Sequence, residues 1–332
     1  MDKLSITYFF RHPDAGFSIG KVFIPVVRHF RETAQVDTCT MTKHDASLKG
    51  ILRNILHTRR HRNRHDINHI TGDIEYITLG LLGCKSVLTV HDTTYADSMA
   101  NPVKRLFFRW MYTIIPLLCA KRVTCISHKT RLSLQRFTWR KDIVVIPDAV
   151  DTTIFHHSPK DFQSEYPTLL IIGTAWNKNV PRQIRALKGI HCRLHIVGRL
   201  NEDIHNALQE TGVEYRQFQN LSDEEIFQQY QDADILLFCT LAEGFGMPVV
   251  EAQTVGRPVV SSRIQPIIDV AGKGACLVNP NSETEIHNAV LRVINDAEYR
   301  QQLTADGLAN ARRYTPEIVN QMYEQVYRSL LS

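Results

Sequence analysis

Short apolar runs alternate with longer segments of helical periodicity along the whole chain. The runs indicate buried strands, and the periodic segments between them indicate amphipathic helices. A strand and helix alternation of this kind predicts parallel sheets with helices packed against them. The pattern starts again after a stretch rich in Asp, Ser, Pro and His near residues 149–166. The sequence therefore predicts an α/β protein with two domains joined by a linker.

The individual elements follow from this pattern. Strands are predicted in the first half at Leu4–Phe10, Val36–Thr40, Asp66–Ile70, Ser86–Val90, Arg122–Ile126 and Ile143–Ile146, with helices at Ser18–Thr33, Ile74–Leu82, Pro102–Cys119 and Lys129–Phe137. Strands are predicted in the second half at Thr168–Ile172, Arg193–Val197, Val213–Arg216, Asp234–Cys239, Pro258–Ser261 and Ala275–Val278, with helices at Val180–Leu187, Asp203–Thr211, Asp223–Gln231, Pro248–Val255 and Glu283–Asn295. Two more helices, Ala297–Arg312 and Pro316–Leu331, close the chain. We expect domains at 1–149, completed by the helix at 316–332, and at 150–315.

The composition is that of an ordinary globular protein. The chain has 332 residues, of which 43% are hydrophobic and 22% are charged. We expect neither a signal peptide nor a membrane-spanning helix, because no apolar stretch approaches the ~20 residues that cross a bilayer. Seven scattered cysteines without a Cys-x-x-Cys motif indicate reduced thiols. These features predict a cytoplasmic protein.

Charge is distributed unevenly between the halves. Residues 1–150 hold 23 Lys and Arg against 12 Asp and Glu, a net +11, whereas residues 151–332 are at −6. The basic run at 57–65 indicates contact with an anionic membrane at the inner face or with a phosphate-bearing acceptor, or simply a solvated loop. No aromatic residues interleave the run, so nucleic acid is not predicted as a partner. His57, His61 and His65 have helical spacing, but no acidic or thiol partner accompanies them in sequence and no metal site is predicted.

The segment from Glu243 to Glu251 carries the most specific chemical information. It follows an apolar run typical of a buried strand and leads into a helix, with Pro248 suited to the first helical turn. Two glycines, at 244 and 246, allow a tight bend close to a ligand. Free amides at the helix start attract an anion or the hydroxyls of a polar ligand. The spacing allows both carboxylates to face one pocket, although an ordinary strand–loop–helix turn has the same outline.

This segment resembles the E-x7-E motif of the retaining glycosyltransferases of family GT4, which have the GT-B fold. Further matching segments are Ile171-Ile172-Gly173, Asn177-Lys178-Asn179, Leu194 to Gly198, Asp232 to Ile235, Gly256 to Val260, Val278-Asn279-Pro280, and Pro147 to Asp151 with Phe155. The resemblance implies two Rossmann-like parallel-sheet domains that face an interdomain cleft, with acceptor binding in the first domain and donor binding in the second. It covers about residues 143–315 with high specificity and the first half more loosely.

The resemblance also implies roles for individual residues. The donor is expected to be a nucleotide sugar, UDP- or GDP-linked, with no other cofactor. Glu251 is expected to bind the ribose hydroxyls, since one carboxylate can accept from both hydroxyls of a diol. Glu243 is expected to contact the transferred sugar, and Lys178 the diphosphate, whose negative charge grows as it leaves. Thr174 belongs to the same donor-binding set.

The remaining implied site residues supply backbone groups and one imidazole. Amides of Gly244, Phe245 and Gly246 are expected to hold sugar hydroxyls and the diphosphate. His91 is expected to contact the donor sugar, although a structural histidine bound to Asp92 would have the same sequence context. Gly16 and Phe17 occupy the place of the family's glycine-rich loop and are expected to contact the diphosphate; a capped helix start at Ser18 explains them equally well.

Several positions depart from the family pattern. The family often has a Gly-Arg pair before its lysine, but here Gly173 is followed by Thr174. The second phosphate-binding cation is then missing unless Arg11, Arg182 or Arg199 replaces it. Asp232-Ala233-Asp234 has the outline of a metal-binding Asp-x-Asp motif. We interpret it as the junction of a helix and a buried strand, so no metal site is predicted.

Together these features predict a metal-independent retaining glycosyltransferase. It would move a hexosyl group from a nucleotide diphosphate donor to a glycan or lipid-linked acceptor, in the synthesis of a cell-surface polysaccharide. The same architecture is also compatible with a nucleotide-sugar epimerase or phosphorylase, which would need no acceptor glycan. A third hypothesis is a non-catalytic module that binds sugar nucleotides. A dinucleotide dehydrogenase is not favoured, because no Gly-x-Gly-x-x-Gly follows the first strand.

Overall fold

The computed structural model describes residues 4–15, 18–93 and 100–331. Within them the chain forms two compact units. Unit 1 comprises Met1–Asp151 and Thr315–Ser332, and unit 2 comprises Thr152–Tyr314. Each unit contains one six-stranded sheet in which every pair of neighbouring strands is parallel.

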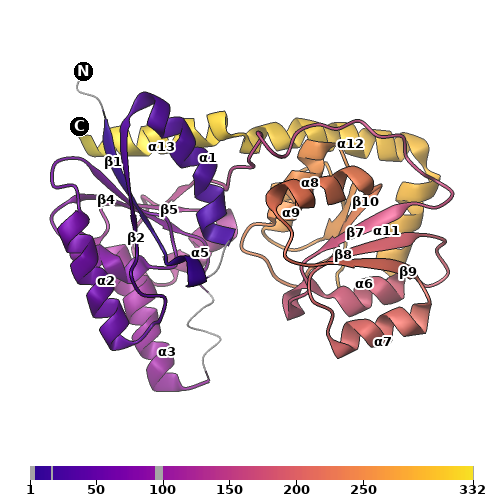
Figure 1. Ribbon diagram of the computed structural model, residues 1–332, viewed down its shortest axis with the longest axis horizontal. Coiled ribbons are helices and arrows are strands. Elements are labelled where there is room, and N and C mark those ends of the chain that lie inside the picture. The colour runs from indigo at the N-terminus through magenta and orange to yellow at the C-terminus, as the bar shows by residue number, and fades with distance from the viewer. Residues whose placement is uncertain (1–3, 16–17, 94–99, 332) are drawn as a thin grey trace. The chain divides into compact units, whose positions relative to one another are not determined.

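The sheet of unit 1 has the strand order β2-β1-β3-β4-β5-β6, and β1, β2, β4 and β5 are labelled in Figure 1. Its strands are β1 (Ser5–Phe10), β2 (Gln35–Thr40), β3 (Ile67–Ile70), β4 (Lys85–Val90), β5 (Arg122–Cys125) and β6 (Val144–Val145). The chain winds from β1 to β2 on one side and then continues with β3 on the other. The order therefore reverses between β1 and β3, and such a reversal leaves a crevice at the carboxyl ends of the two strands.

Helices cover both faces of this sheet. They are α1 (Ser18–Thr33), α2 (Leu48–His61), α3 (Pro102–Arg109), α4 (Ile115–Cys119), α5 (His128–Gln135) and the C-terminal α13 (Pro316–Leu331), with shorter turns η1 (Pro13–Ala15), η2 (Glu75–Leu81) and η3 (Trp110–Ile114). Alternate residues of β1 face opposite cores. Tyr8 packs with α1 and α13, whereas Phe9 packs with α2 and η2.

The C-terminal helix α13 belongs to the core of unit 1, although it is last in the chain. The hydroxyl of Tyr327 lies 3.0 Å from that of Tyr8 on β1 and 2.6 Å from Nδ1 of His69 on β3. All three side chains are fully buried. Burial lowers the pKa of His69 to about 3, so the ring is neutral and its two nitrogens serve as one donor and one acceptor.

The sheet of unit 2 has the strand order β12-β11-β10-β7-β8-β9. Its strands are β7 (Thr168–Ile172), β8 (Arg193–Val197), β9 (Glu214–Phe218), β10 (Ile235–Phe238), β11 (Val259–Ser262) and β12 (Cys276–Val278). Here the order reverses between β7 and β10, which is the arrangement of a doubly wound dinucleotide-type sheet.

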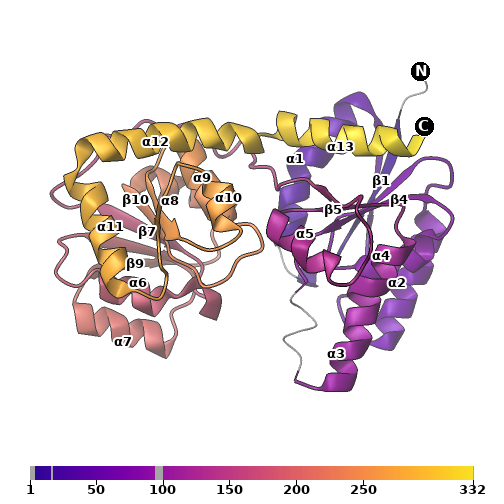
Figure 2. The same ribbon diagram turned by 180° about the vertical axis from the view of Figure 1, so that it is seen from behind.

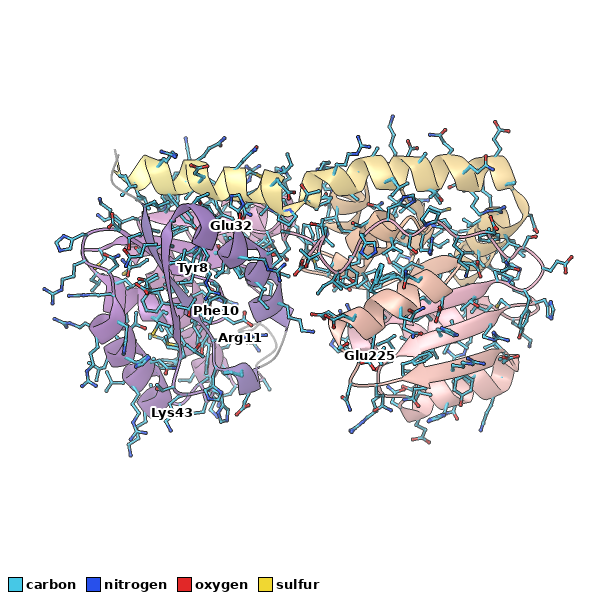
Figure 3. All side chains as sticks on the ribbon, turned by 45° about the horizontal axis from the view of Figure 1, so that its top comes forward. Tyr8, Phe10, Arg11, Glu32, Lys43 and Glu225 are labelled. Carbon is cyan, nitrogen blue, oxygen red and sulfur yellow. The ribbon has the colours of Figure 1, made fainter. Side chains whose placement is uncertain are left out.

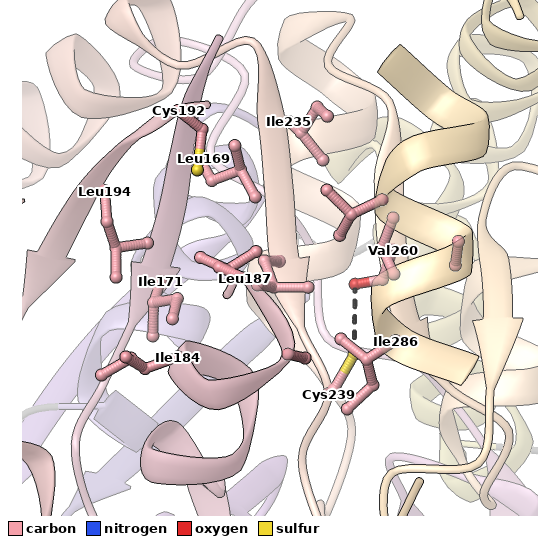
Figure 4. Packing of buried hydrophobic residues seen from close by; sticks show 14 of the residues in the cluster. Leu169, Ile171, Ile184, Leu187, Cys192, Leu194, Ile235, Cys239, Val260 and Ile286 are labelled. Carbon is pink, nitrogen blue, oxygen red and sulfur yellow. Dashed lines mark hydrogen bonds between the residues drawn. The ribbon is translucent and has the colours of Figure 1, made fainter. Parts of the chain in front are cut away.

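The helices of unit 2 alternate with its strands. They are α6 (Val180–Ala186), α7 (Glu202–Thr211), α8 (Asp223–Asp232), α9 (Met247–Val255), α10 (Ile267–Ala271), α11 (Glu283–Asn295) and α12 (Ala297–Ala311), with turns η4 (Trp176–Lys178) and η5 (Arg312–Tyr314); α10 is labelled in Figure 2. One core packs Leu169 and Ile171 of β7 against Ile184 of α6 and Ile286 of α11 (Figure 4). These side chains are at most 1% exposed, so this face of the sheet is dry and rigid.

The structure differs from the predicted elements in a few places. The predicted helix at Ile74–Leu82 is a 3-10 helix, and the one at Pro102–Cys119 contains the π-helical turn η3. Helices α2 and α10 were not predicted. Helix α2 does not have the usual amphipathic pattern, in which apolar residues are buried and polar residues are exposed. Its buried residues include Asn54 and Thr58. Its leucines Leu48, Leu52 and Leu56 are 45–70% exposed.

Candidate functional site

Two charged residues of the predicted donor site, Lys178 and Glu243, lie at the strand-order reversal of unit 2. Lys178 ends the short helix η4, which follows β7. Glu243 lies in the loop between β10 and α9. In open α/β sheets, ligands bind outside the carboxyl ends of the strands at such a reversal. The topology therefore brings these residues to the position where the fold forms a binding crevice.

Hydrogen bonds hold the loops after β7 and β10 together. Asn177 Nδ2 donates to the carbonyl of Ala242 at 2.8 Å, and Asn179 Nδ2 donates to the carbonyl of Cys239 at 3.0 Å. Asn179 also donates to Pro280 at 2.8 Å, which adds the loop after β12. Asn179 adopts a left-handed conformation with φ of 58°, which Asn tolerates better than most residues. The residues flanking Lys178 thus fix its position relative to Glu243.

Lys178 and Glu243 form a partly buried ion pair. Lys178 Nζ donates to Glu243 Oε1 at 2.7 Å, and the two side chains are 19% and 11% exposed. The ammonium also lies 4.8 Å from the centre of the Phe238 ring. The lysine stem crosses Gly173, where an added Cβ would lie 3.2 Å from Lys178 Cε and where φ is +85°. A glycine at 173 therefore keeps the path of the lysine open.

The turn into α9 is built from residues 244–246. Gly246 has φ of 110° and would place a Cβ 2.4 Å from Ile267 Cδ1, so only glycine fits there. Phe245 is 5% exposed, and its ring packs 5.5 Å from the ring of Tyr314. The Phe245 side chain is therefore part of the core. What Gly244, Phe245 and Gly246 can offer a ligand is their backbone.

The second glutamate lies one turn inside α9. Glu251 Oε2 accepts a hydrogen bond of 2.7 Å from the hydroxyl of Tyr230, which also donates to the carbonyl of Pro248 at 3.2 Å. Tyr230 is fully buried, and burial, together with the nearby Glu251 charge, raises the pKa of Tyr230 well above its usual value. The neutral phenol is thus a fixed donor that orients one oxygen of the carboxylate.

Tyr230 is a site residue that the sequence did not reveal. It lies on α8, where a buried tyrosine fits the apolar face of an amphipathic helix and looks like any core residue. Its hydroxyl gives the only clue, because a buried tyrosine hydroxyl needs a hydrogen-bond partner. The sequence does not say that this partner is Glu251.

The residues considered as phosphate ligands beside Lys178 have different surroundings. Thr174 follows Gly173, and its side chain packs closely against Gly198 in the loop after β8. A Cβ added at Gly198 would lie only 2.6 Å from Thr174 Oγ1. Arg182 donates to Asn179 Oδ1 at 2.7 Å and so supports the loop that carries the lysine. Arg199 is exposed. Of the two unit 2 arginines that the sequence offers as a second phosphate ligand, Arg182 is engaged in the scaffold and Arg199 is exposed to solvent.

Asp234 lies just before the amino end of β10, whereas Glu243 follows the carboxyl end of the same strand. That is the position expected for a junction between a helix and a strand. Helix α8 ends at Asp232 and β10 begins at Ile235. Asp234 is 2% exposed, accepts from the Thr168 backbone N–H at 2.8 Å, and pairs with Lys160 at 3.0 Å. These contacts use the carboxylate to fasten the amino ends of the strands.

His91 directly follows β4 in unit 1 and is 6% exposed. Its Nε2 bonds to the carbonyl of Thr71 at 2.8 Å, and its Nδ1 lies 3.8 Å from Oδ1 of Asp148. Burial raises the pKa of the Asp148 carboxyl, while the histidine opposes that shift. The imidazole is therefore fixed in orientation, with Nδ1 directed to Asp148 in the segment after β6.

The loops after β1 and β3 also meet in unit 1. Tyr8 lies within β1 and Arg11 follows its carboxyl end (Figure 3). Arg11 is paired with Asp73 at 2.5 Å, and the backbone N–H of Asp73 donates to Glu75 Oε1 at 3.0 Å. The Asp73 side chain is 42% exposed, whereas Glu75 is buried. Burial, aided by the charge of Asp73, raises the pKa of Glu75 far above the usual range. Gly16 and Phe17, predicted to follow this strand as phosphate ligands, lie outside the described residues.

Comparison with known proteins identifies the family. Residues 153–308 match the glycosyl transferases group 1, and residues 14–154 match glycosyltransferase family 4. The chain belongs to glycosyltransferase family 4. The family resemblance carried by the sequence motifs is thereby confirmed, and the chain is classed as a glycosyltransferase.

Curated relatives are more distant and match only in part. O-antigen chain mannosyltransferase B of Escherichia coli is 33% identical over 95 residues, which are 29% of this chain and 25% of that protein. O-antigen chain mannosyltransferase RfbU of Salmonella typhimurium is 27% identical over 222 residues, which are 62% of this chain and 60% of that protein. The chain thus matches less than two thirds of the length of either relative.

Solved structures share the whole fold at low sequence identity. Sucrose-phosphate synthase from Thermosynechococcus elongatus superposes with a TM-score of 0.80 at 16% identity and covers 99% of both chains. HepE from Anabaena, in complex with UDP-glucose, gives a TM-score of 0.77 at 15% identity, with 98% of this chain and 100% of that chain covered. These likenesses confirm the predicted α/β fold class, with two parallel sheets of the GT-B type.

Proposed function

We propose that this protein transfers a hexosyl group from a nucleoside diphosphate to a hydroxyl of a glycan or lipid-linked acceptor, with retention of configuration. The observation that carries the proposal is the Lys178–Glu243 pair at the reversal between β7 and β10. It sets one cation and one carboxylate side by side where a donor would lie. Glycosyl transfer develops negative charge on the leaving diphosphate and positive charge on the sugar ring, so it needs both kinds of group.

Each role follows from the chemistry of the group. Lys178 Nζ would leave Glu243 for the diphosphate and stabilise it as the sugar–oxygen bond breaks. Glu243, freed from that pair, would face the sugar ring as positive charge develops. Glu251, oriented by the Tyr230 hydroxyl, would accept hydrogen bonds from the ribose hydroxyls. Backbone amides of residues 244–246 would hold sugar hydroxyls and phosphate oxygens, with Thr174 near the same loop.

The bond changes balance without a covalent enzyme intermediate. The acceptor oxygen would form its bond to the anomeric carbon on the face from which the diphosphate leaves. Its proton would pass to a phosphate oxygen of the leaving group. Lys178 and the amides would meet the phosphate charge in place of a divalent cation. In unit 1, Gly16, Phe17 and Arg11 are proposed as further phosphate contacts, and Nδ1 of His91 as a contact to the sugar, since Nε2 is engaged by Thr71.

The donor is proposed to be UDP- or GDP-linked. Two curated relatives are named as mannosyltransferases, and a structural neighbour was solved with UDP-glucose. These names favour a hexose on a pyrimidine or guanine nucleotide, in the synthesis of a cell-surface polysaccharide. A thermal-shift screen with UDP, GDP, ADP and their sugars would identify the base, because a ligand that binds only the folded chain raises its melting temperature.

One experiment tests the reaction itself. The purified chain is incubated with the selected nucleotide sugar and a panel of glycan and polyprenyl-linked acceptors, without added divalent metal. We expect an acceptor-dependent product whose new linkage has the donor's anomeric configuration by NMR. Release of a free altered sugar or a sugar phosphate without acceptor would indicate an epimerase or phosphorylase instead. Donor binding without any turnover would indicate a binding module.

We also propose that unit 1 meets an anionic membrane at the cytoplasmic face, where a lipid-linked acceptor would be found. No helix among the described residues is long and apolar enough to cross a bilayer. Helix α2 instead exposes Leu48, Leu52 and Leu56 along one stripe, and its last turn is basic. An exposed apolar stripe beside cationic residues is typical of a helix that lies in the membrane interface.

Vesicle flotation tests this contact. We expect binding to vesicles rich in phosphatidylserine or phosphatidylglycerol, and weaker binding to neutral vesicles. Leu52→Glu should reduce binding, whereas Ile318→Glu, at a half-exposed position of α13, should not. Equal recovery of all three proteins with anionic vesicles would reject the role of α2.

A further inference from the structure

A thiol and two imidazoles meet where the last turn of α2 packs against the edge strand β2. Cys39 lies on β2, and His57 and His61 lie one helical turn apart on α2. The Cys39 sulfur and one ring nitrogen of each histidine all lie within 4.8 Å of one another. Cys39 is 7% exposed, His57 is half-buried and His61 is exposed. The cluster therefore has a buried floor and an open side.

The distances within the cluster suit a small tetrahedral ion. Zinc bonds of roughly 2.3 Å to sulfur and 2.0 Å to nitrogen place neighbouring ligand atoms about 3.5 Å apart at a tetrahedral angle. Cys39 Sγ and His57 Nε2 are 3.3 Å apart. Two of the three ligands are thus already at the required separation. The third, the exposed His61 side chain, can close the remaining gap by a small rotation.

Backbone groups orient both imidazoles. His61 Nδ1 lies 2.9 Å from the carbonyl of His57 and donates to it, while the His57 ring bonds the backbone of Thr40. Metal-binding histidines commonly use their second nitrogen in this way, which fixes the ring and its tautomer.

We propose that Cys39, His57 and His61 bind one Zn²⁺ ion, with water as the fourth ligand. Thiolate and imidazole together favour Zn²⁺ over the hard cations Mg²⁺ and Ca²⁺. When the ion binds, the Cys39 thiol loses its proton to solvent. The resulting thiolate offsets part of the ion's positive charge, which lies beside the arginines in the last turn of α2. The ion would fasten the end of α2 to β2. The helical spacing of His57 and His61 is visible in the sequence, but the thiol that completes the set is not.

This zinc site is independent of the proposed transfer reaction. Strand β2 is at the edge of the unit 1 sheet, and β1 and β3 separate it from β4, which His91 follows. With strands about 4.8 Å apart, that is a distance of roughly 14 Å. Arg11 follows β1, the neighbour of β2, but its guanidinium pairs with Asp73. None of the three zinc ligands is a residue assigned to donor chemistry. Zinc binding can therefore be measured without any sugar substrate.

The test uses the full chain without an affinity tag, titrated with Zn²⁺ alone after treatment with a chelator and reductant. We expect one equivalent to bind and to raise the melting temperature. Co²⁺ in its place should give a thiolate-to-cobalt charge-transfer band, which reports a Cys ligand directly. His61→Gln, a change at an exposed position, should weaken zinc binding by about 100-fold or more. Cys39→Ser should abolish the cobalt band.

Two controls separate this site from other histidines. His12, Asp14 and His44 also lie close enough to share an ion, but all are half-buried or exposed and none offers sulfur. His44→Ala should leave the stoichiometry and the cobalt band unchanged. His65→Ala, four residues past the end of α2, should also leave them unchanged. The proposal is overturned if the wild-type chain binds no zinc, if the cobalt band is absent, or if His61→Gln binds as tightly as wild type.

Discussion

The two sheets reverse their strand order in comparable ways, but the polar groups at the two reversals are organised differently. In unit 2, the loops after β7 and β10 exchange hydrogen bonds and carry the Lys178–Glu243 pair, one cation for one carboxylate. In unit 1, the loops after β1 and β3 hold Arg11 against Asp73, with Glu75 buried beside them. The arginine there pairs with Asp73, while Glu75 accepts a hydrogen bond from the backbone of Asp73 and has no cation paired with it among the described residues.

This difference has a physical consequence. A matched pair keeps both groups charged and in place, since each lowers the free-energy cost of burying the other. A buried carboxyl group without a paired cation behaves in the opposite way, because burial and the charge of a neighbouring carboxylate favour the protonated form. The pKa of the buried Glu75 is raised accordingly. Unit 2 thus presents a cation paired with a carboxylate, whereas the charge of Glu75 at the unit 1 reversal depends on pH.

The largest expected effect comes from removing the cation of the matched pair. Lys178→Ala should lower kcat for sugar transfer by about 100-fold, because one charge contact to the leaving group is worth ~3 kcal/mol in the transition state. Initial rates at saturating donor measure it. Lys188→Ala, at an exposed position of the same unit, should have wild-type kcat. A Lys178→Ala enzyme with unchanged turnover would remove this residue from the mechanism.

A smaller effect is expected at the second glutamate and the tyrosine that orients it. Glu251→Gln should raise KM for the donor by about tenfold with little change in kcat, because it weakens a contact made equally in the ground and transition states. Tyr230→Phe should shift KM in the same direction but less, by roughly 1 kcal/mol at most, since one neutral hydrogen bond is lost. Steady-state kinetics with varied donor measure both. A Tyr230→Phe effect on kcat alone would contradict the positioning role.

The scaffold of the unit 2 reversal can be tested through stability alone. Asn179→Gly keeps the left-handed backbone accessible but loses the bonds to Cys239 and Pro280. It should lower the free energy of unfolding by about 1–3 kcal/mol. Asn179→Ala loses the same bonds and also strains the backbone, so it should cost about 1 kcal/mol more. Urea unfolding measures both. Equal stability of the two variants would show that the backbone conformation contributes nothing.

These contrasts also explain what the sequence could predict. The order of strands and helices came from apolar periodicity, and the fold class was confirmed. Residues of the E-x7-E segment are contiguous, so the sequence identified them as one unit. The hydrogen bonds that position this segment and the chain just before it come from distant residues: Tyr230 on α8 bonds Glu251, and Asn179 after β7 bonds Cys239. Only the folded chain shows such pairings, because no local pattern encodes them.

Helix α2 shows the second reason for failure. A sequence pattern predicts a helix well when its apolar face is the buried one. Here the buried face includes Asn54, which bonds Tyr76 and the carbonyl of Lys43, while three leucines are exposed. Apolar residues thus lie on both faces of the helix, since Ile51 is buried as well. The same packing brings Cys39 to His57, a juxtaposition with no trace in the linear sequence.

The smallest expected effect is a change of folding stability with pH that comes from Glu75, the buried acidic residue at the unit 1 reversal. A folded-state pKa raised above the unfolded value of about 4.3 means that folded Glu75 holds its proton longer than the unfolded chain does. The stability contributed by the protonated form is complete below pH ~4 and is lost as pH rises through the folded pKa. The slope reaches at most about 1.4 kcal/mol per pH unit for one group.

Glu75→Gln removes that titration and keeps the oxygen that accepts from Asp73. The variant should therefore gain stability relative to wild type as pH is raised from about 4.3, the unfolded value, toward 8, with a slope of at most about 1.4 kcal/mol per pH unit. Urea unfolding at several pH values measures the difference, in which the opposite contribution of His69 cancels because both proteins carry it. Glu32→Gln, at an exposed position of α1, should show no such trend. A difference between Glu75→Gln and wild type that stays constant with pH would mean that Glu75 does not titrate in this range, and the contrast between the two reversals would then rest on their hydrogen bonds alone.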